Sequence, residues 1–277
     1  MRSSNPVMNT LVDPRQRQMQ QQQYNPFDQY GAPGMAPGMA QPAAYADERP
    51  MTVDDVVSKT GITLGVIIAF AVVNFGISVF VSVALGTLLT FVGAIGGLIA
   101  VLVGTFGKKF GSAAVTLIYA AFEGLFVGGI SFLFTNTMVA GASASALIGQ
   151  AVLGTIGVFL GMLYVYKTGA IKVTPKFTRL LTAGIIGVLV LSVGNLIMAL
   201  LGMGSPLRDG GMLAIIFSLV CIGLAALSFL QDFDTADKLI RQGAPAKMAW
   251  GVALGLAVTL VWLYTEILRL LSYFQQR

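Results

Sequence analysis

The sequence predicts an all-α integral membrane protein with seven transmembrane helices and a disordered N-terminal tail. Three observations predict this class. First, 56% of the 277 residues are hydrophobic and only 10% are charged, which is far more apolar than an ordinary soluble domain. Second, apolar runs of about 20 residues follow one another from residue 62 onward, each long enough to cross about 30 Å of hydrocarbon. Third, the first 50 residues are polar and rich in Gln, Gly and Pro.

Residues 1–50 are predicted to form a disordered cytoplasmic tail, and residues 51–277 the transmembrane domain. The Gln-rich stretch 16–23 and the Gly/Pro/Met/Ala repeat 31–40 have too little apolar surface to form a packed core. No basic segment followed by a short apolar run and a small-residue cleavage site begins the chain, so we expect no cleaved signal peptide. The first transmembrane helix is expected to direct membrane insertion.

The transmembrane domain begins with a helix-start signal. Thr52-Val-Asp-Asp55 matches a capping box, in which Thr52 accepts from the backbone N–H three residues on and Asp55 reaches back to the cap. A short interfacial helix is predicted over residues 53–59, with its valines as the apolar stripe.

Seven transmembrane spans follow this start signal. The first two are separated at Ala84-Leu85-Gly86, where small residues interrupt the apolar run. The spans cover approximately residues 62–83, 85–106, 112–134, 146–166, 180–202, 212–231 and 249–274.

The charges between the spans predict the orientation. An odd number of spans places the two termini on opposite faces, and the positive-inside rule then places the N-terminus in the cytoplasm and the C-terminus outside the cell membrane. Arg208 and Arg277 are the only cations in the connections and terminus on the opposite side. The nine cations on the N-terminal side are Lys108, Lys109, Lys167, Lys172, Lys176, Arg179, Lys238, Arg241 and Lys247.

Small and polar residues predict how the helices pack. Asn74 and Asn195, each in the middle of a span, are expected to hydrogen-bond between helices. Glycines four residues apart allow helix backbones to approach closely. They occur at Gly93/Gly97, Gly124/Gly128, Gly157/Gly161 and Gly251/Gly255.

The composition excludes several functions. The chain has no His, which removes Ser/His and Cys/His catalysis, His-ligated zinc and imidazole pH switches. Cys221 lies in an apolar run and is predicted to be a small buried thiol. Residues 1–60 hold five cations against six anions, so the positive excess lies in the membrane domain and reflects its topology. We expect no nucleic-acid partner, no enzymatic activity and no cofactor.

Ionisable groups within the spans are the main candidates for function, because each is costly in hydrocarbon. Glu123 lies about eleven residues into the third span with no cation in that span, which favours a pore-lining role over a structural one. Glu266 lies toward the outer face, three residues before Arg269. This spacing predicts an ion pair that anchors the end of a helix.

An acidic cluster, Asp232-Phe-Asp-Thr-Ala-Asp237, follows the sixth span. Four-residue spacing allows Asp234 to pair with Lys238, and Asp237 with Arg241. Asp232 has no cation one turn away and still adjoins the apolar run, where a carboxyl can change its charge within the physiological pH range. Asp232 and Asp234 are therefore the candidate pH-sensing gate, and with Glu123 the candidate metal ligands.

At these motifs the sequence resembles the transmembrane Bax inhibitor motif family, and in particular its bacterial Bax-inhibitor-like branch. The resemblance covers roughly residue 52 to the C-terminus, and the order and spacing of the motifs across seven spans carry it. The segments are Ser4-Asn-Pro-Val7, 52–61, Glu123-Gly-Leu-Phe-Val-Gly128, Asp232-Phe-Asp-Thr235, Gly243-Ala-Pro245 and 259–271.

The resemblance implies a seven-helix membrane protein whose last helix is central and which leaks calcium under pH control. It also implies that an Asp at the end of the sixth helix, here Asp232 or Asp234, pairs with an Asp in the seventh. That second position falls on Thr259 in this chain, and Glu266 lies about two turns deeper. A pH sensor would then use Asp232 with Asp234, or one Asp against a cation of the second connection, Lys108 or Lys109.

The leading hypothesis is a pH-sensitive calcium or other cation leak, lined by Glu123 and closed near Asp232 and Asp234. Carboxylates and carbonyls are the oxygen ligands that hard divalent cations prefer, whereas the calcium itself comes from the resemblance. One alternative is a secondary transporter of a small solute or proton, against which seven spans do not divide into equal halves. Another is a non-conducting membrane scaffold in stress response, whose Gln-rich tail recruits protein partners.

Overall fold

The computed structural model describes residues 49–107, 109–136 and 144–275, which belong to one compact unit, Ala46–Arg277. The predicted tail therefore lies outside the described residues except for Arg49 and Pro50, and so do Lys108 and Arg277.

Seven long helices form the described part of the chain, and each is long and apolar enough to cross a membrane. The fold class predicted from the sequence is thus confirmed. A 3₁₀ helix, η2 (Ala246–Met248), leads into the last of them. The seven are α3 (Val53–Phe80), α4 (Val83–Phe106), α5 (Ala113–Asn136), α6 (Ala144–Thr168), α7 (Pro175–Leu200), α8 (Met212–Arg241) and α9 (Ala249–Gln275).

The first helix differs from the prediction at both ends. The capping box is present, with Thr52 accepting from the Asp55 backbone and Asp55 reaching back to Thr52. The helix it starts continues without a break to Phe80, so the separate interfacial helix over residues 53–59 is wrong. The break between the first two spans lies at 81–82 rather than 84–86. There the Ser82 side chain caps the N-terminus of α4 and leaves residues 84–86 helical.

The sixth span also extends further than predicted, because α8 continues to Arg241 and includes the whole acidic cluster. Two ion pairs at four-residue spacing support this extension, together with the cations Lys238 and Arg241 in the last turn, where the helix dipole favours positive charge. Asp232 therefore lies within a helix, about two and a half turns before its end.

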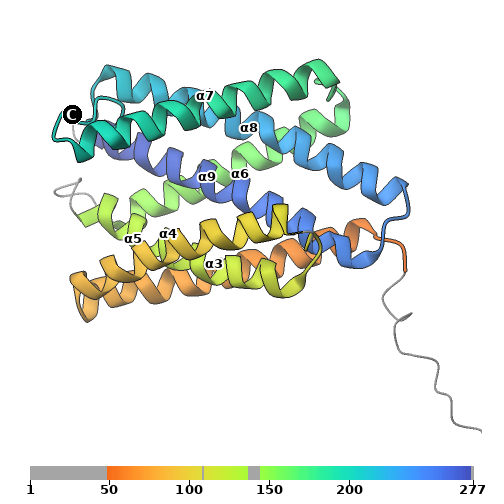
Figure 1. Cartoon of the computed structure of the whole chain (residues 1–277), viewed down its shortest axis with the longest axis horizontal. Helices are drawn as coiled ribbons and strands as arrows, with labels where there is room; N and C mark the ends of the chain where they lie inside the picture. Colours follow the sequence, from red (N-terminus) through yellow and green to blue (C-terminus); the bar gives the residue numbers. More distant parts are fainter. Residues whose placement is uncertain (1–48, 108, 137–143, 276–277) are drawn as a thin grey trace, which may run out of the picture. The chain divides into compact units, whose positions relative to one another are not determined.

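Helix α9 is the centre of the bundle. In its most apolar stretch 72% of residues are buried, against 6% for α7. It packs against α3, α5, α6 and α8, and Figure 1 shows it between the group α3, α4 and α5 and the group α7 and α8. The central position implied for the last helix is confirmed.

Glycines bring α5 against α3 and α4. A Cβ on Gly124 would lie 2.5 Å from the carbonyl oxygen of Ile67 in α3, and one on Gly93 would lie 2.6 Å from the carbonyl oxygen of Phe122 in α5. Only glycine allows the backbones this close. The same expectation fails for Gly157 and Gly161, because nothing in the described structure lies within 4 Å of either Cβ position.

The two predicted asparagines behave differently. Asn74 in α3 donates from Nδ2 to Thr90 Oγ1 of α4 at 3.1 Å and to the Leu125 carbonyl of α5 at 2.6 Å, so its interhelical role is confirmed. Asn195 in α7 hydrogen-bonds to residues 205 and 207 of the following connection. Its predicted interhelical bond is wrong, because that connection folds back over the end of α7.

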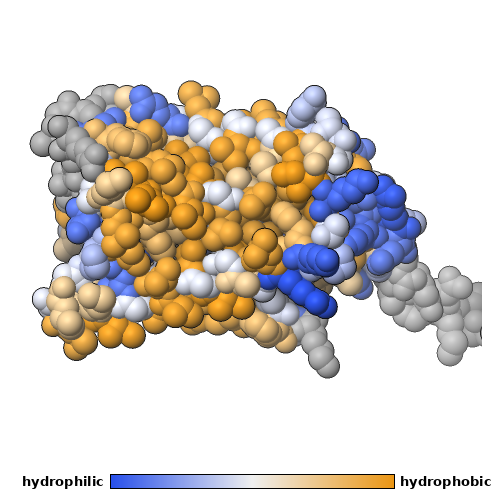
Figure 2. Space-filling view, turned by 90° about the horizontal axis from the view of Figure 1, so that it is seen from above, coloured by the Kyte–Doolittle hydropathy of each residue, from blue (hydrophilic) through white to orange (hydrophobic). Residues whose placement is uncertain are grey.

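Apolar side chains cover most of the visible face in Figure 2, and hydrophilic residues gather at one end of the bundle. At this end α3 begins, α8 ends and α9 begins. We call it the hairpin end, after the α8–α9 hairpin, and the opposite end the far end. An apolar surface of this extent fits burial in lipid.

Candidate functional site

Asp232 faces the central helix. The Thr259 hydroxyl of α9 lies 2.7 Å from Asp232 Oδ2 and donates to it, while also lying 3.2 Å from the Gly255 carbonyl of its own helix. A Cβ on Gly255 would be 3.8 Å from Asp232 Oδ1, an ordinary contact distance. The position where the resemblance implies a second Asp, Thr259, is thus the position that contacts Asp232.

The rest of the acidic cluster faces away from this contact. Asp234 pairs with Lys238 at 2.5 Å, and Asp237 with Arg241 at 2.8 Å, with both cations largely exposed. Residues two apart on a helix point in nearly opposite directions, so the structure does not bring Asp232 and Asp234 together. No ion pair joins Lys109 to either Asp in the described residues, and Lys108 lies outside them.

Glu123 lies on another side of α9, in a cavity of about 310 Å³ between α4, α5 and α9. Within the described part of the chain its carboxyl has no hydrogen-bond or ion-pair partner. Gly97 of α4 allows the approach, since a Cβ there would be 2.7 Å from Glu123 Oε2. The lining residues are Ala94, Gly97, Leu98, Val101, Tyr119, Glu123, Phe126, Val258, Val261, Trp262 and Thr265.

The two carboxyls lie beside adjacent faces of α9. Asp232 meets residues 255 and 259, whereas the cavity of Glu123 is lined by residues 258, 261, 262 and 265 of the same helix. At about 100° per residue these two sets lie roughly a quarter-turn apart and overlap along the helix axis. A rotation or displacement of α9 would therefore alter both surroundings together.

Glu266 and Arg269 form the ion pair that their spacing predicts. Arg269 donates to Glu266 at 2.7 Å, and both side chains are buried. The second carboxylate oxygen of Glu266 has no partner among the described atoms. The connection between α7 and α8 places Arg208 near this pair, where burial and then the charge of Arg269 lower the pKa of the Arg208 guanidinium.

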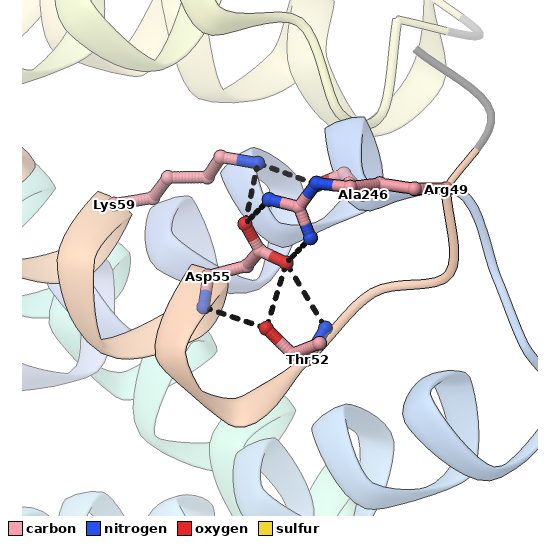
Figure 3. A network of polar contacts seen from close by, with 5 residues as sticks. All are labelled: Arg49, Thr52, Asp55, Lys59 and Ala246. Carbon is pink, nitrogen blue, oxygen red and sulfur yellow. Dashed lines mark hydrogen bonds and ion pairs between the residues drawn. The ribbon is translucent and has the colours of Figure 1, made fainter.

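Sequence reasoning missed a polar network at the hairpin end, shown in Figure 3. Arg49 donates to both carboxylate oxygens of Asp55 at 2.8 and 2.6 Å, and Thr52 donates to the same group through its backbone and its hydroxyl. Lys59 donates to the Ala246 carbonyl at 2.5 Å. The capping box and the Gly243-Ala-Pro245 motif gave local signals, but no spacing rule connects groups 187 residues apart.

The candidate metal ligands Glu123, Asp232 and Asp234 do not converge. Among the described residues no group of three or more His, Cys, Asp or Glu side chains is positioned to hold a metal ion. Calcium takes six to eight oxygen ligands in a stable site. The side chains of the described structure therefore do not build a tight calcium site.

Fold and buried carboxyls together define a multi-pass helical membrane protein. The sequence matches the family model described as Bax inhibitor 1 like over residues 5–276, nearly its whole length. The chain belongs to this family. No curated protein matches it. The family match also covers most of the predicted tail, which the motif resemblance reached only at Ser4-Asn-Pro-Val7.

Proposed function

We propose that the protein is a pH-sensitive cation leak of the cell membrane, with calcium as the leading candidate ion. The observation that carries the proposal is that two carboxyls, Asp232 and Glu123, flank adjacent faces of the most buried helix within the apolar part of the bundle. Ionisable groups at that depth are rare and mark ion or proton pathways.

A leak fits this arrangement better than a site that holds its ion. Conduction requires binding that is strong enough for entry and weak enough for release. A single unpaired carboxyl in a mostly apolar cavity, with no group of three or more acidic side chains placed to hold a metal ion among the described residues, supplies weak attraction for a cation. The family membership supports a membrane function of this kind, and the ion remains part of the proposal.

The contact between Asp232 and Thr259 is proposed to close the pathway. A hydrogen bond from a hydroxyl to a charged carboxylate is roughly twice as strong as a hydrogen bond between neutral partners. Protonation of Asp232 therefore weakens the bond between α8 and α9, and Thr259 retains its alternative acceptor, the Gly255 carbonyl. In this mechanism acid pH loosens the closure and raises the flux.

The proposed orientation places the hairpin end in the cytoplasm. Among the described connections, Arg208 lies at the far end, whereas the connections and helix ends at the hairpin end carry most of the cations. These are Lys109, Lys167, Lys172, Lys176, Arg179, Lys238, Arg241 and Lys247. The positive-inside rule supports this assignment.

The test is calcium entry into liposomes that contain the purified protein and a calcium dye, measured from pH 5 to pH 8. We expect wild-type flux above protein-free liposomes, highest at acid pH. Asp232→Asn, which mimics the protonated state, should conduct at the acid level at every pH. Asp234→Asn is the matched control, because Asp234 pairs with an exposed Lys on the same helix, and it should keep the wild-type profile.

Glu123→Gln tests the pathway itself. It should lower the flux at every pH while the protein remains folded, since the cavity already accommodates a side chain of that size. An Asp232→Asn profile identical to that of the wild type would reject the gate. Absence of flux at any pH, from folded protein, would reject the leak and favour the transporter or scaffold alternatives.

A further inference from the structure

The four residues before α3 form an arm, Arg49 to Thr52, that is attached to the α8–α9 hairpin. Pro50 and Pro245 form an antiparallel β-bridge. The Met51 backbone donates to the Ala244 carbonyl at 2.7 Å, and the Ala246 backbone donates to the Arg49 carbonyl at 2.9 Å. The arm thus pairs with the turn that joins the helices carrying Asp232 and Thr259.

Asp55 anchors this arm to α3. Its carboxylate accepts hydrogen bonds from Arg49 and Thr52, and Lys59 lies 3.8 Å away. Lys59 also reaches the hairpin by donating to the Ala246 carbonyl and lies 5.8 Å above the centre of the Trp250 ring. Figure 3 shows Arg49, Thr52 and Lys59 converging on the Asp55 carboxylate. Asp55 is only 8% exposed, so this carboxylate depends on its partners.

Met51 connects the arm to the interior. Its side chain is 2% exposed and belongs to one apolar cluster with residues of both hairpin helices. That cluster includes Phe233, the neighbour of Asp232 in sequence, and Leu256, the neighbour of Gly255. The cluster therefore extends from the arm to the level of the Asp232–Thr259 contact, and withdrawal of Met51 would leave a void in this cluster.

The arm is a small structure compared with the helices it joins. Its attachments include two backbone hydrogen bonds to the hairpin, the buried Met51 side chain and the ion pair of Arg49 with Asp55, and the Arg49 side chain is 61% exposed. The Asp55 carboxylate would still accept hydrogen bonds from Thr52 and lie 3.8 Å from Lys59 if Arg49 left. Residues 49–51 can thus leave the hairpin without unfolding α3, because Thr52 stays with Asp55 in the capping box and helix packing maintains the rest of α3.

We propose that the arm is a displaceable clasp, anchored by Asp55, that holds the α8–α9 hairpin in the closed state and must leave the hairpin for the pathway to open. This inference rests on the proposed cation leak for its functional consequence. It adds a regulatory element at the start of the membrane domain, where the predicted cytoplasmic tail joins it, so that events on the tail could reach the gate through Met51.

A disulfide across the bridge tests the clasp directly. The hydrogen bonds flank the pair 50 and 245, which makes it a non-hydrogen-bonded antiparallel pair with a Cα separation of about 4.5 Å, within the range a disulfide spans. The double variant Pro50→Cys/Pro245→Cys is made in a Cys221→Ala background. Its flux at acid pH should fall by about tenfold or more on oxidation and return on reduction. The two single-Cys variants are controls and should not respond.

A second measurement does not depend on ion flux. In the same Cys221→Ala background, Leu256→Cys places a thiol in the buried cluster, and its reaction with a water-soluble maleimide reports opening of the hairpin. Met51→Ala should speed this labelling several-fold, whereas Val53→Ala, an exposed neighbour, should not. If Met51→Ala speeds labelling while no variant conducts, the clasp stands and the leak fails. In a protein that conducts, flux unchanged by the disulfide would overturn the clasp, and labelling unchanged by Met51→Ala would overturn it whether or not the protein conducts.

Discussion

Asp232 and Glu123 are two acids that the same central helix accommodates in different ways. Each rests near a glycine of a neighbouring helix: Gly255 faces Asp232, and Gly97 faces Glu123. Asp232 also accepts a hydrogen bond from the Thr259 hydroxyl. Glu123 instead lies in a cavity and has no hydrogen-bond or ion-pair partner among the described residues. A buried acid is thus satisfied on the α8 side by a donor and on the α4–α5 side by space for water or an ion. The first arrangement suits a closure, and the second suits a pathway.

The largest expected effect comes from creating an unpaired acid at a buried position outside the Glu123 cavity. Arg269→Met leaves the Glu266 carboxylate without its partner at a buried position. Removing one member of a buried pair typically costs about 3–5 kcal/mol, so we expect a loss of that size in the free energy of unfolding, measured in lipid–detergent micelles. Glu123 also lacks a partner among the described residues, but its cavity of about 310 Å³ has room for water.

The control for this prediction is the double variant Arg269→Met/Glu266→Gln, which removes the charge together with its partner. It should recover at least half of the lost stability. If Arg269→Met alone has the same free energy of unfolding as the wild type, a buried acid on α9 needs neither a partner nor a cavity. The contrast between Asp232 and Glu123 would then lose its basis.

The next largest effect concerns the donor to Asp232. Thr259→Val removes the hydroxyl at nearly constant volume and leaves a half-buried carboxylate without a partner. A hydrogen bond to a charged group contributes about 1.5–3 kcal/mol, so the free energy of unfolding at pH 8 should fall by that amount. Protonation of Asp232 removes the charge that needs the donor, so the difference from the wild type should shrink at pH 5.

Thr259→Ser keeps the donor and serves as the matched variant, with stability close to the wild type at both pH values. A Thr259→Val difference that is the same at pH 5 and pH 8 would mean that Asp232 does not change its charge in this range. The proposed gate would then lose its titrating group.

Much of the fold could be predicted from the sequence because hydrocarbon thickness and helix geometry fix the length of a span. The capping box at Thr52 and the pairs at Asp234 and Glu266 are equally local, and the structure contains all three. The errors arose where two local rules competed. The first two spans are separated at residues 81–82, where Ser82 begins α4, rather than at Gly86. The apolar run stops at residue 231, although α8 continues to Arg241.

The arrangement around α9 could not be predicted in the same way. Spacing along one helix does not predict that Thr259 hydrogen-bonds to Asp232. It also does not predict the cavity between α9 and Gly97 of α4. The Thr259 assignment came from the family resemblance, and the contact with Asp232 from the structure. The clasp at Asp55 was missed for the same reason, since its two halves are local motifs at opposite ends of the membrane domain.

The smallest expected effect on stability tests the Glu123 side. Gly97→Ala places a methyl group 2.7 Å from Glu123 Oε2, the end of a flexible side chain, and nothing else of the described structure lies closer than 3.8 Å. The carboxyl can move into the cavity, and alanine favours the helix, so the free energy of unfolding should change by less than about 1 kcal/mol. Flux should nevertheless fall toward the level of Glu123→Gln, because the displaced carboxyl fills the space that the ion is proposed to use.

Gly93→Ala, one turn earlier on α4, is the matched control because its methyl group would meet backbone atoms of α5 at 2.6 and 2.7 Å. Overpacking against backbone should cost about 1–3 kcal/mol, so this variant should lose stability. The two substitutions separate packing from function. Gly97→Ala is expected to disturb the fold less than Gly93→Ala, but to reduce conduction through the cavity more. A Gly97→Ala protein that is stable and conducts as the wild type would place the pathway elsewhere than beside Glu123, leaving the Asp232 face of α9 as the remaining candidate.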